Sequence, residues 1–194
     1  MSFFKKLFNI PKKEDESILN QEVILCLDDL FVNNFVEKGG KFLYSSDKIE
    51  ITDNLSKILK ENNWKQLTLL DAKLSAYFNK EELEISEIFK PDTPVFLSCE
   101  HLIADNGDVL FSSNQLKSAK LSEMPQNFIV YATTSQIVNN MGQGLTGIKT
   151  NYKGNLPTNI SAIKNYNINK SDDNFLNYGN SNSKNLYLLL LEDL

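Results

Sequence analysis

An acidic turn in the middle of the chain carries the side chains most able to do chemistry. The turn Asp105–Asp108 separates two apolar runs and contains the pair Asn106-Gly107. Asn-Gly between apolar runs predicts a tight β-hairpin turn, because both residue types tolerate positive φ. The pair therefore has a purely structural explanation. The alternative is that Asp105 projects into a crevice as an acid, a base or a ligand-orienting group, with Asn106 and Gly107 contacting the ligand.

A second candidate is Glu100-His101, which contains the single histidine of the chain. A histidine beside a carboxylate can act as a tuned base, and Glu100 alone could serve as an acid–base or nucleophilic carboxylate. Adjacent residues of a strand point to opposite faces, so we do not expect a dyad. A histidine without a triad or metal set is more simply explained as structural. Cys99 lies in an apolar run without an activating base, so we do not expect a nucleophilic thiolate.

Any anion must be held without arginine, because every basic residue of the chain is a lysine. No bidentate guanidinium clamp is available, which leaves lysines, hydroxyls, amides and backbone N–H groups. Thr134, Ser135 and Gln136 follow the strand-like run 128–132 and open a predicted helix, Ser135–Leu145. Free N–H groups at a helix start can bind an anion. The same residue types are also common helix caps, and that explanation stays open.

The elements that must position these residues alternate between strands and helices. Helices are predicted from Ser17 to Lys38, ending at Gly39-Gly40, and from Thr52 to Trp64, with Thr52 or Asp53 as the cap. Strands are predicted at 41–45, 66–70, 95–104, 109–112, 128–132 and 186–191, with 160–163 as a short strand or helical turn and 171–184 largely as a loop. This order predicts an α/β domain with a largely parallel sheet plus one β-hairpin. In such sheets ligands bind beyond the carboxyl ends of the strands, near Ser45, Asp71, Thr134 and Asp193.

Length and composition limit the classes of protein to which the chain can belong. A chain of 194 residues predicts one domain, which we place at 17–194, after a flexible tail at 1–16. The tail mixes phenylalanine and lysine, so contact with a membrane surface is the alternative, but no stable membrane anchor is expected. The net charge of −5 argues against nucleic-acid binding. The two cysteines cannot by themselves hold an iron–sulfur cluster or a structural zinc, and we expect reduced thiols in a cytoplasmic protein with no metal site.

The order of these segments resembles the LUD-domain (lactate-utilisation) family. In that family an Ile-Ala-acid-Thr-Gly-Thr turn precedes a basic residue, a proline and a strand ending in Ser-Gln-Ile-Val. The matching residues here are Asp105 with Gly107, Lys117 or Lys120, Pro125, and Ser135–Val138. The family's Gly-Pro-Ser-x-Thr-Ala-Asp-Ile segment resembles residues 156–163 and adds Thr158 to the ligand-binding candidates.

The chain departs from the family pattern at several positions. Asn106 and Asp108 stand where the family usually has threonines, and Leu156 replaces a glycine. The family's late Gly-x-His-Gly-Pro motif is reduced to Tyr178-Gly179-Asn180. These differences weaken the transfer of a site more than the transfer of a fold.

The resemblance implies a Rossmann-like three-layer sandwich, similar to the sugar-phosphate isomerase and CoA-transferase superfamily. It also implies an accessory protein of lactate or similar small-carboxylate utilisation, acting through an anionic ligand or an iron–sulfur protein partner and without a cofactor of its own. One alternative is an isomerase or acyl-CoA transferase that uses Asp105 or Glu100. Another is a diverged, non-catalytic relative, since fold alone does not establish chemistry.

Overall fold

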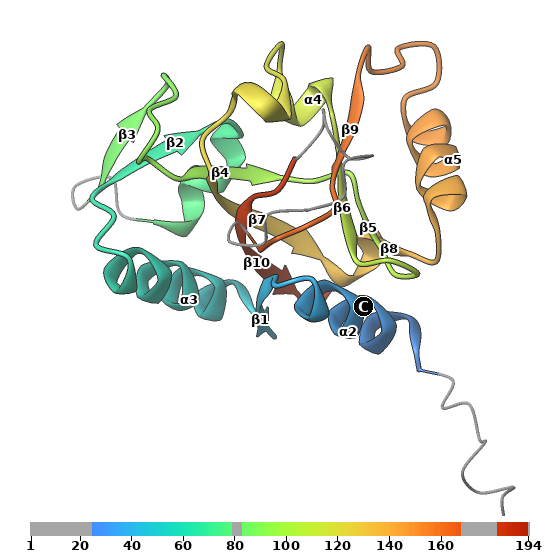
Figure 1. The fold of residues 1–194 in the computed structure, drawn as a ribbon, viewed down its shortest axis with the longest axis horizontal. Helices are drawn as coiled ribbons and strands as arrows, with labels where there is room; N and C mark the ends of the chain where they lie inside the picture. The colour runs from blue at the N-terminus through green and yellow to red at the C-terminus, as the bar shows by residue number, and fades with distance from the viewer. Residues whose placement is uncertain (1–24, 79–82, 168–181, 194) are drawn as a thin grey trace, which may run out of the picture.

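Six parallel strands form the main sheet of the computed structural model, which describes residues 25–78, 83–167 and 182–193 (Figure 1). Their order across the sheet is β1 (Lys41–Ser45), β10 (Asn185–Leu191), β7 (Asn127–Thr133), β4 (Val95–Ser98), β2 (Gln66–Leu69) and β3 (Glu84–Ser86). The continuous leucine run of β10 suits its internal position, because an internal parallel strand is covered on both faces. The predicted α/β class with a largely parallel sheet is confirmed.

A smaller sheet lies beside the main one, in the order β8 (Ile137–Val138), β5 (His101–Ile103), β6 (Asp108–Ser112) and β9 (Ile160–Ile163). The predicted hairpin is present as the antiparallel pair β5–β6. The prediction of one strand from Val95 to Ala104 was wrong, because the run breaks after Ser98. Gln136 Nε2 donates to the carbonyls of Cys99 and Glu100 at 2.7 and 3.2 Å, and so satisfies the backbone at the break.

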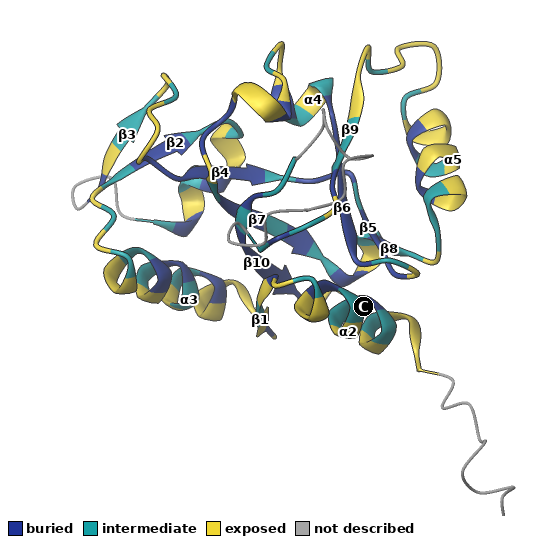
Figure 2. Ribbon diagram, viewed as in Figure 1, coloured by how far each residue is buried: buried dark blue, intermediate teal, exposed yellow. Residues whose placement is uncertain are grey.

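The two faces of the main sheet are covered differently. Helix α3 (Lys48–Glu61) and the 3-10 helix η2 (Ala72–Tyr77) cover one face, where Leu55 and Ile58 pack with Phe96. Helix α2 (Leu27–Glu37) and the small sheet cover the other face, where Phe31 and Phe35 pack with strand residues. Helix α5 (Met141–Asn151) packs through Ile148 on the outer face of the small sheet (Figure 1). Figure 2 shows the buried sides of the helices turned toward the sheets.

Three helix starts differ from the prediction. Helix α2 begins at Leu27 after Cys26, and the described residues Leu25 and Cys26 lie outside it although the prediction placed them in the helix from Ser17. Helix α3 begins one turn earlier than expected, because Asp47 and not Thr52 or Asp53 is its cap: Asp47 Oδ1 accepts from the backbone N–H groups of Ile49 and Glu50. The predicted helix Ser135–Leu145 is a 3-10 turn (Thr134–Gln136) followed by β8, and α5 starts at Met141 after the cap Asn140.

Some predictions lie wholly or partly outside the described residues. They are the tail 1–16, the start of the predicted helix at Ser17, most of the loop 171–184, and Tyr178-Gly179-Asn180. The single domain at 17–194 also stays a prediction. Within the described ranges, no helix is both long and apolar enough to cross a membrane.

Candidate ligand-binding cavity

A cavity of about 500 Å³ opens at the carboxyl ends of β2 and β4, opposite the short helix α4 (Ser113–Leu116). This edge of a parallel sheet is where the general rule for α/β folds places a ligand. The cavity is lined by Leu70, Asp71, Ala72, Lys73, Leu97, Ser98, Asn114, Gln115, Lys117 and Tyr152.

The strand side of the cavity is organised around the carboxylate of Asp71. Asp71 follows β2 and caps η2, with Oδ1 accepting from the backbone N–H of Lys73 at 3.0 Å. Ser98, the last residue of β4, donates its hydroxyl to Asp71 Oδ2 at 3.1 Å. These bonds hold the carboxylate on the cavity wall beside the exposed side chain of Lys73.

The opposite side is built by a capping box at the end of β6. The hydroxyl of Ser112 accepts from the Asn114 backbone N–H at 3.0 Å, and Gln115 Oε1 accepts from the Ser112 N–H at 2.8 Å. The helix that follows is a single turn and ends at Lys117, whose φ of 58° and ψ of −127° are strained for a residue other than glycine. Lys117, the residue with this strained backbone, also lines the cavity.

Glu100 lies buried behind this wall, with 8% of its surface exposed. Its Oε1 accepts from the Ser112 hydroxyl at 2.5 Å, and its Oε2 accepts from the Tyr152 hydroxyl at 3.2 Å. Among the described residues no lysine or histidine pairs with this carboxylate. Burial, and secondarily the negative charge of Glu100, raises the pKa of Tyr152, which therefore keeps its proton at neutral pH. Tyr152 thus separates a buried carboxylate from the cavity.

His101 does not join Glu100, as the alternation along a strand predicts. Its Nδ1 lies 3.3 Å from the carbonyl oxygen of Gln136. Its Nε2 is buried without a hydrogen-bond partner in the described part of the chain, against Gly147 of α5. Cys99 is buried, which raises the pKa of its thiol and keeps it protonated. Neither residue lines the cavity.

The hairpin turn lies at the far end of β5 and β6 from Glu100 and Ser112. Asp105 is exposed there, so the structure does not bring it to the other candidates. Asp108 is buried in an ion pair of 2.9 Å with Lys38, the residue that follows α2, and the Asn106 side chain accepts from the Asp108 N–H. Gly107 has a φ of +70° and packs against the α2 backbone, where a Cβ would meet Phe35 N at 2.5 Å. The contacts of Asn106 and Gly107 are those of a tight hairpin turn packed on α2, in agreement with the structural explanation of this pair.

Thr134 and Ser135 hold an anionic group, but it belongs to this chain. The carboxylate of Asp193 accepts from the Thr134 hydroxyl at 2.8 Å, the Ser135 N–H at 2.9 Å and the Ser135 hydroxyl at 2.7 Å. The hydrogen bond from the Ser135 hydroxyl is the largest cause that lowers the pKa of Asp193 to about 2. Asp193 thus takes up the donors that we expected to meet a ligand, while Gln136 braces the break after β4.

Of the predicted site residues, Asp71 and Lys117 line the cavity, and Glu100 lies directly behind it. Lys120 pairs with Glu123 at 3.7 Å on the surface, and Thr158 is exposed, with its N–H donating to the Ser113 hydroxyl. Sequence reasoning missed Tyr152, Ser112, Ser98, Lys73, Asn114 and Gln115. The spacing Ser112-x-x-Gln115 would have indicated the short helix. The sequence does not predict that Tyr152 lies beside Glu100, because the two residues are brought together only by the packing of α5 on the small sheet.

The described residues contain no group of three or more His, Cys, Asp or Glu side chains placed to hold a metal ion. The cavity lining itself offers two ammonium groups, one carboxylate, amides and hydroxyls.

Comparison with known proteins places this fold in a family. A model of the LUD domain matches residues 29–191, and the chain belongs to the LUD-domain family. The crystal structure of a DUF162 family protein from Deinococcus radiodurans is similar, with a TM-score of 0.61 and 12% identity over 87% of this chain and 99% of that chain. At this identity the likeness concerns the fold alone. No curated protein matches the chain.

Proposed function

We propose that this LUD-domain protein binds a small organic anion in the cavity between β2, β4 and α4, and that it acts in the utilisation of lactate or a similar small carboxylate. The observation that carries the proposal is a pair of lysines, Lys73 and Lys117, on one cavity at the carboxyl edge of the sheet. Neither ammonium group has a carboxylate partner among the described residues. Lys117 Nζ donates to the Asn114 carbonyl at 3.4 Å, and an anion entering the cavity would gain charge-assisted hydrogen bonds from the donors that remain on the two ammonium groups.

The remaining lining residues suit a ligand with hydroxyl or carbonyl groups. Ser98, Asn114, Gln115 and Tyr152 bring donors and acceptors to the cavity. A volume of about 500 Å³ exceeds what lactate needs, and it also accommodates a sugar phosphate or part of a larger ester. The family supports the lactate setting by analogy, and the lining supports the anionic class by chemistry.

A second candidate function is acid–base catalysis in the same cavity. It is favoured by Glu100, a buried carboxylate whose described partners are the hydroxyls of Ser112 and Tyr152. A proton could pass between a ligand and Glu100 through the Tyr152 hydroxyl, which touches both regions. This is the isomerase or acyl-CoA-transferase alternative, with Glu100 rather than Asp105 as the acting carboxylate.

An iron–sulfur protein partner remains part of the proposal on the strength of the family resemblance. Affinity purification of the chain from its native cells, followed by iron analysis and mass spectrometry of what is retained, tests it. Recovery of an iron–sulfur protein at constant stoichiometry is the expected result, and repeated recovery of the chain alone contradicts the partner.

The test of the binding site is thermal unfolding against lactate, pyruvate, sugar phosphates, CoA esters and folates. A ligand at a hundred times its Kd stabilises the native state by about 2.7 kcal/mol. We expect a rise in Tm with one class of anion, lost in Lys117→Gln and kept in Lys120→Gln, since Lys120 lies on the same loop but does not line the cavity. An equal shift in both variants, or none with any compound, rejects the site.

The catalytic candidate has its own readout. Turnover with isomerase and acyl-transfer substrates should vanish in Glu100→Gln and persist in Glu123→Gln, an exposed carboxylate at a distance from the cavity. Activity that survives Glu100→Gln excludes the acid–base role and leaves the binding proposal intact.

A further inference from the structure

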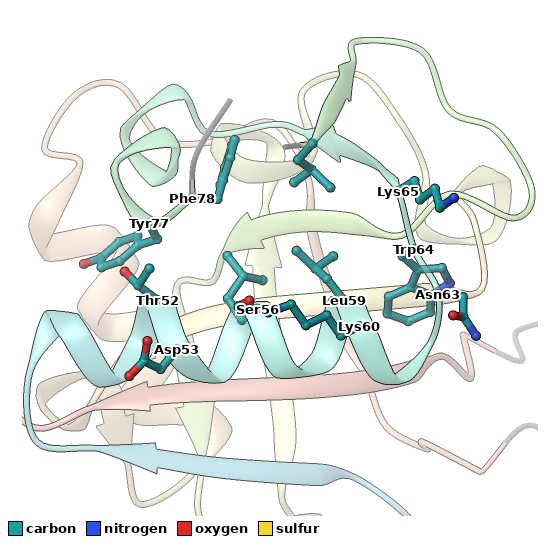
Figure 3. A pocket seen from close by; sticks show the side chains of 12 residues that line it. Thr52, Asp53, Ser56, Leu59, Lys60, Asn63, Trp64, Lys65, Tyr77 and Phe78 are labelled. Carbon is teal, nitrogen blue, oxygen red and sulfur yellow. The ribbon is translucent and has the colours of Figure 1, made fainter. Parts of the chain in front are cut away.

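A second cavity, of about 450 Å³, lies on the face of the main sheet that α3 and η2 cover (Figure 3). One wall is the α3 face that carries Thr52, Ser56, Leu59 and Lys60. The other wall is made by Trp64 and Lys65 just before β2, by Tyr77 at the end of η2 and Phe78 after it, and by Leu83. The first cavity involves the opposite end of η2, at Asp71–Lys73, so the two cavities do not share a lining residue.

Three aromatic side chains line this cavity, and each is fixed by a ring of the main sheet behind it. Trp64 packs edge-on against Tyr187, with ring centroids 6.0 Å apart. Tyr77 lies 5.1 Å from Tyr131, and the two hydroxyls are hydrogen-bonded at 3.1 Å. Phe78 lies 6.5 Å from Phe96. The aromatic walls are therefore preorganised, and a ligand would not have to order them on binding.

Charge is distributed unevenly along the cavity. Figure 3 shows Asn63 and Lys65 at the Trp64 end, Lys60 on the α3 wall between the ends, and Asp53 at the Tyr77 end. No hydrogen bond or ion pair engages the ammonium groups of Lys60 and Lys65 within the described part of the chain, nor the indole N–H of Trp64. The Trp64 end thus offers free donors beside an aromatic face, whereas the other end carries a carboxylate.

We propose that this cavity binds a flat aromatic anion, with its ring against Trp64 and its acidic group toward Lys60 and Lys65. Aromatic rings pack favourably on such faces, and apolar contact with Leu59 and Leu83 adds to this. The two lysines select a negatively charged substituent, and Asp53 disfavours the reverse orientation. The proposal does not depend on the first cavity, because no residue of that cavity takes part.

Trp64 is the single tryptophan of the chain, so its fluorescence reports on this site directly. The probes are 8-anilinonaphthalene-1-sulfonate and its uncharged relative N-phenyl-1-naphthylamine, which has the same aromatic body without the sulfonate. We expect the sulfonate to quench Trp64 with one-to-one stoichiometry and to bind at least about fivefold more tightly than the uncharged probe at low salt.

The double variant Lys60→Gln/Lys65→Gln should bind the sulfonate at least about fivefold more weakly and lose the preference for it. The control Lys48→Gln/Lys57→Gln changes the same charge on α3 without touching the cavity lining, and should stay within about twofold of the original. Equal affinity for the two probes, or equal losses in the two double variants, overturns the proposal. Ser56→Phe, which fills the cavity from the α3 wall, should abolish binding while circular dichroism stays unchanged.

Competition separates the two sources of such an anion. Displacement of the sulfonate by indole-3-acetate, and not by adenosine monophosphate, assigns the site to aromatic carboxylates. The opposite result assigns it to nucleotides. Displacement by neither compound overturns the proposal.

Discussion

The Tyr152 hydroxyl donates a hydrogen bond of 3.2 Å to the carboxylate of Glu100, which joins the end of α5 to the buried start of the hairpin. Tyr152 also lines the cavity at the carboxyl edge of the main sheet, while Glu100 does not reach it. A ligand in the cavity would therefore meet the phenol first, and the carboxylate would act on the ligand only through it. The two proposed functions of this cavity differ in whether that path is used.

Tyr152→Phe should destabilise the protein by about 1–2 kcal/mol, because a buried carboxylate loses one of its hydroxyl donors. Urea denaturation followed by circular dichroism measures the change. The matched control is Tyr44→Phe, since Tyr44 is exposed and the nearby Glu192 carboxylate raises its pKa at the surface. We expect no measurable loss for the control, and equal effects of the two variants would show that burial of Glu100 contributes nothing.

Gly107→Ala should cost about 2–4 kcal/mol, since it combines a positive φ with a collision. The added Cβ would lie 2.5 Å from Phe35 N and 2.6 Å from Asn34 C, both backbone atoms of α2. Gly154→Ala isolates the first effect, because Gly154 has a φ of +81° with nothing within 4 Å of an added Cβ. We expect about 1 kcal/mol there by the same urea assay. A Gly107→Ala loss no larger than that of Gly154→Ala would mean that the turn does not press on α2.

Five of the six strands of the main sheet overlap predicted strands, because each contains an apolar run such as Leu186–Leu191. Strand β3 (Glu84–Ser86) was not predicted, because it is short and mostly polar. The sequence also places the hairpin turn through a local signal, Asn106-Gly107. It does not reveal that the run from Val95 breaks after Ser98, because the break is stabilised by Gln136, a residue far along the chain. The cavity was found only in part, through Asp71 and Lys117, because Tyr152 and Glu100 meet through the packing of α5 on the small sheet.

Asp193 should make stability fall in acid. Its pKa is lowered from 3.8 to about 2 by hydrogen bonds from Ser135 and Thr134, and these bonds form only in the folded chain. As the pH falls, Asp193 is protonated at a lower pH in the folded chain than in the unfolded chain. The stabilisation from the charged carboxylate is therefore complete above pH ~4 and is lost as the pH falls toward 2. Denaturation from pH 7 to pH 2 should show a smaller acid loss in Asp193→Asn. Asp105→Asn, on the exposed hairpin turn, should follow the original profile, and an unchanged profile in Asp193→Asn contradicts the role of these bonds.

Lys184 should make stability rise in base. It is 2% exposed, its ammonium donates to the carbonyl of Met124 at 2.9 Å, and burial lowers its pKa from 10.5 to about 8. Between pH 8 and 10.5 the unfolded chain holds this proton while the folded chain has released it, so folding becomes relatively more favourable as the pH rises. The free energy of unfolding of the original protein should therefore rise relative to that of Lys184→Met across this window, by on the order of 1 kcal/mol. Lys149→Met, exposed on α5, should show a constant difference, and so would Lys184→Met if the amine were solvated.

Lys117 has a strained backbone and also lines the cavity, so we predict that relieving the strain by substitution raises stability but removes ligand binding. Lys117→Gly removes the strain of φ 58° and ψ −127°, and should raise the free energy of unfolding by about 1 kcal/mol even after the added freedom of the unfolded glycine. Lys117→Gln keeps the strain and removes only the charge, so its stability should be unchanged. Both should lose the anion-dependent rise in Tm, because both lack the ammonium group. A ligand shift that survives in Lys117→Gly would show that the ammonium group of Lys117 takes no part in binding.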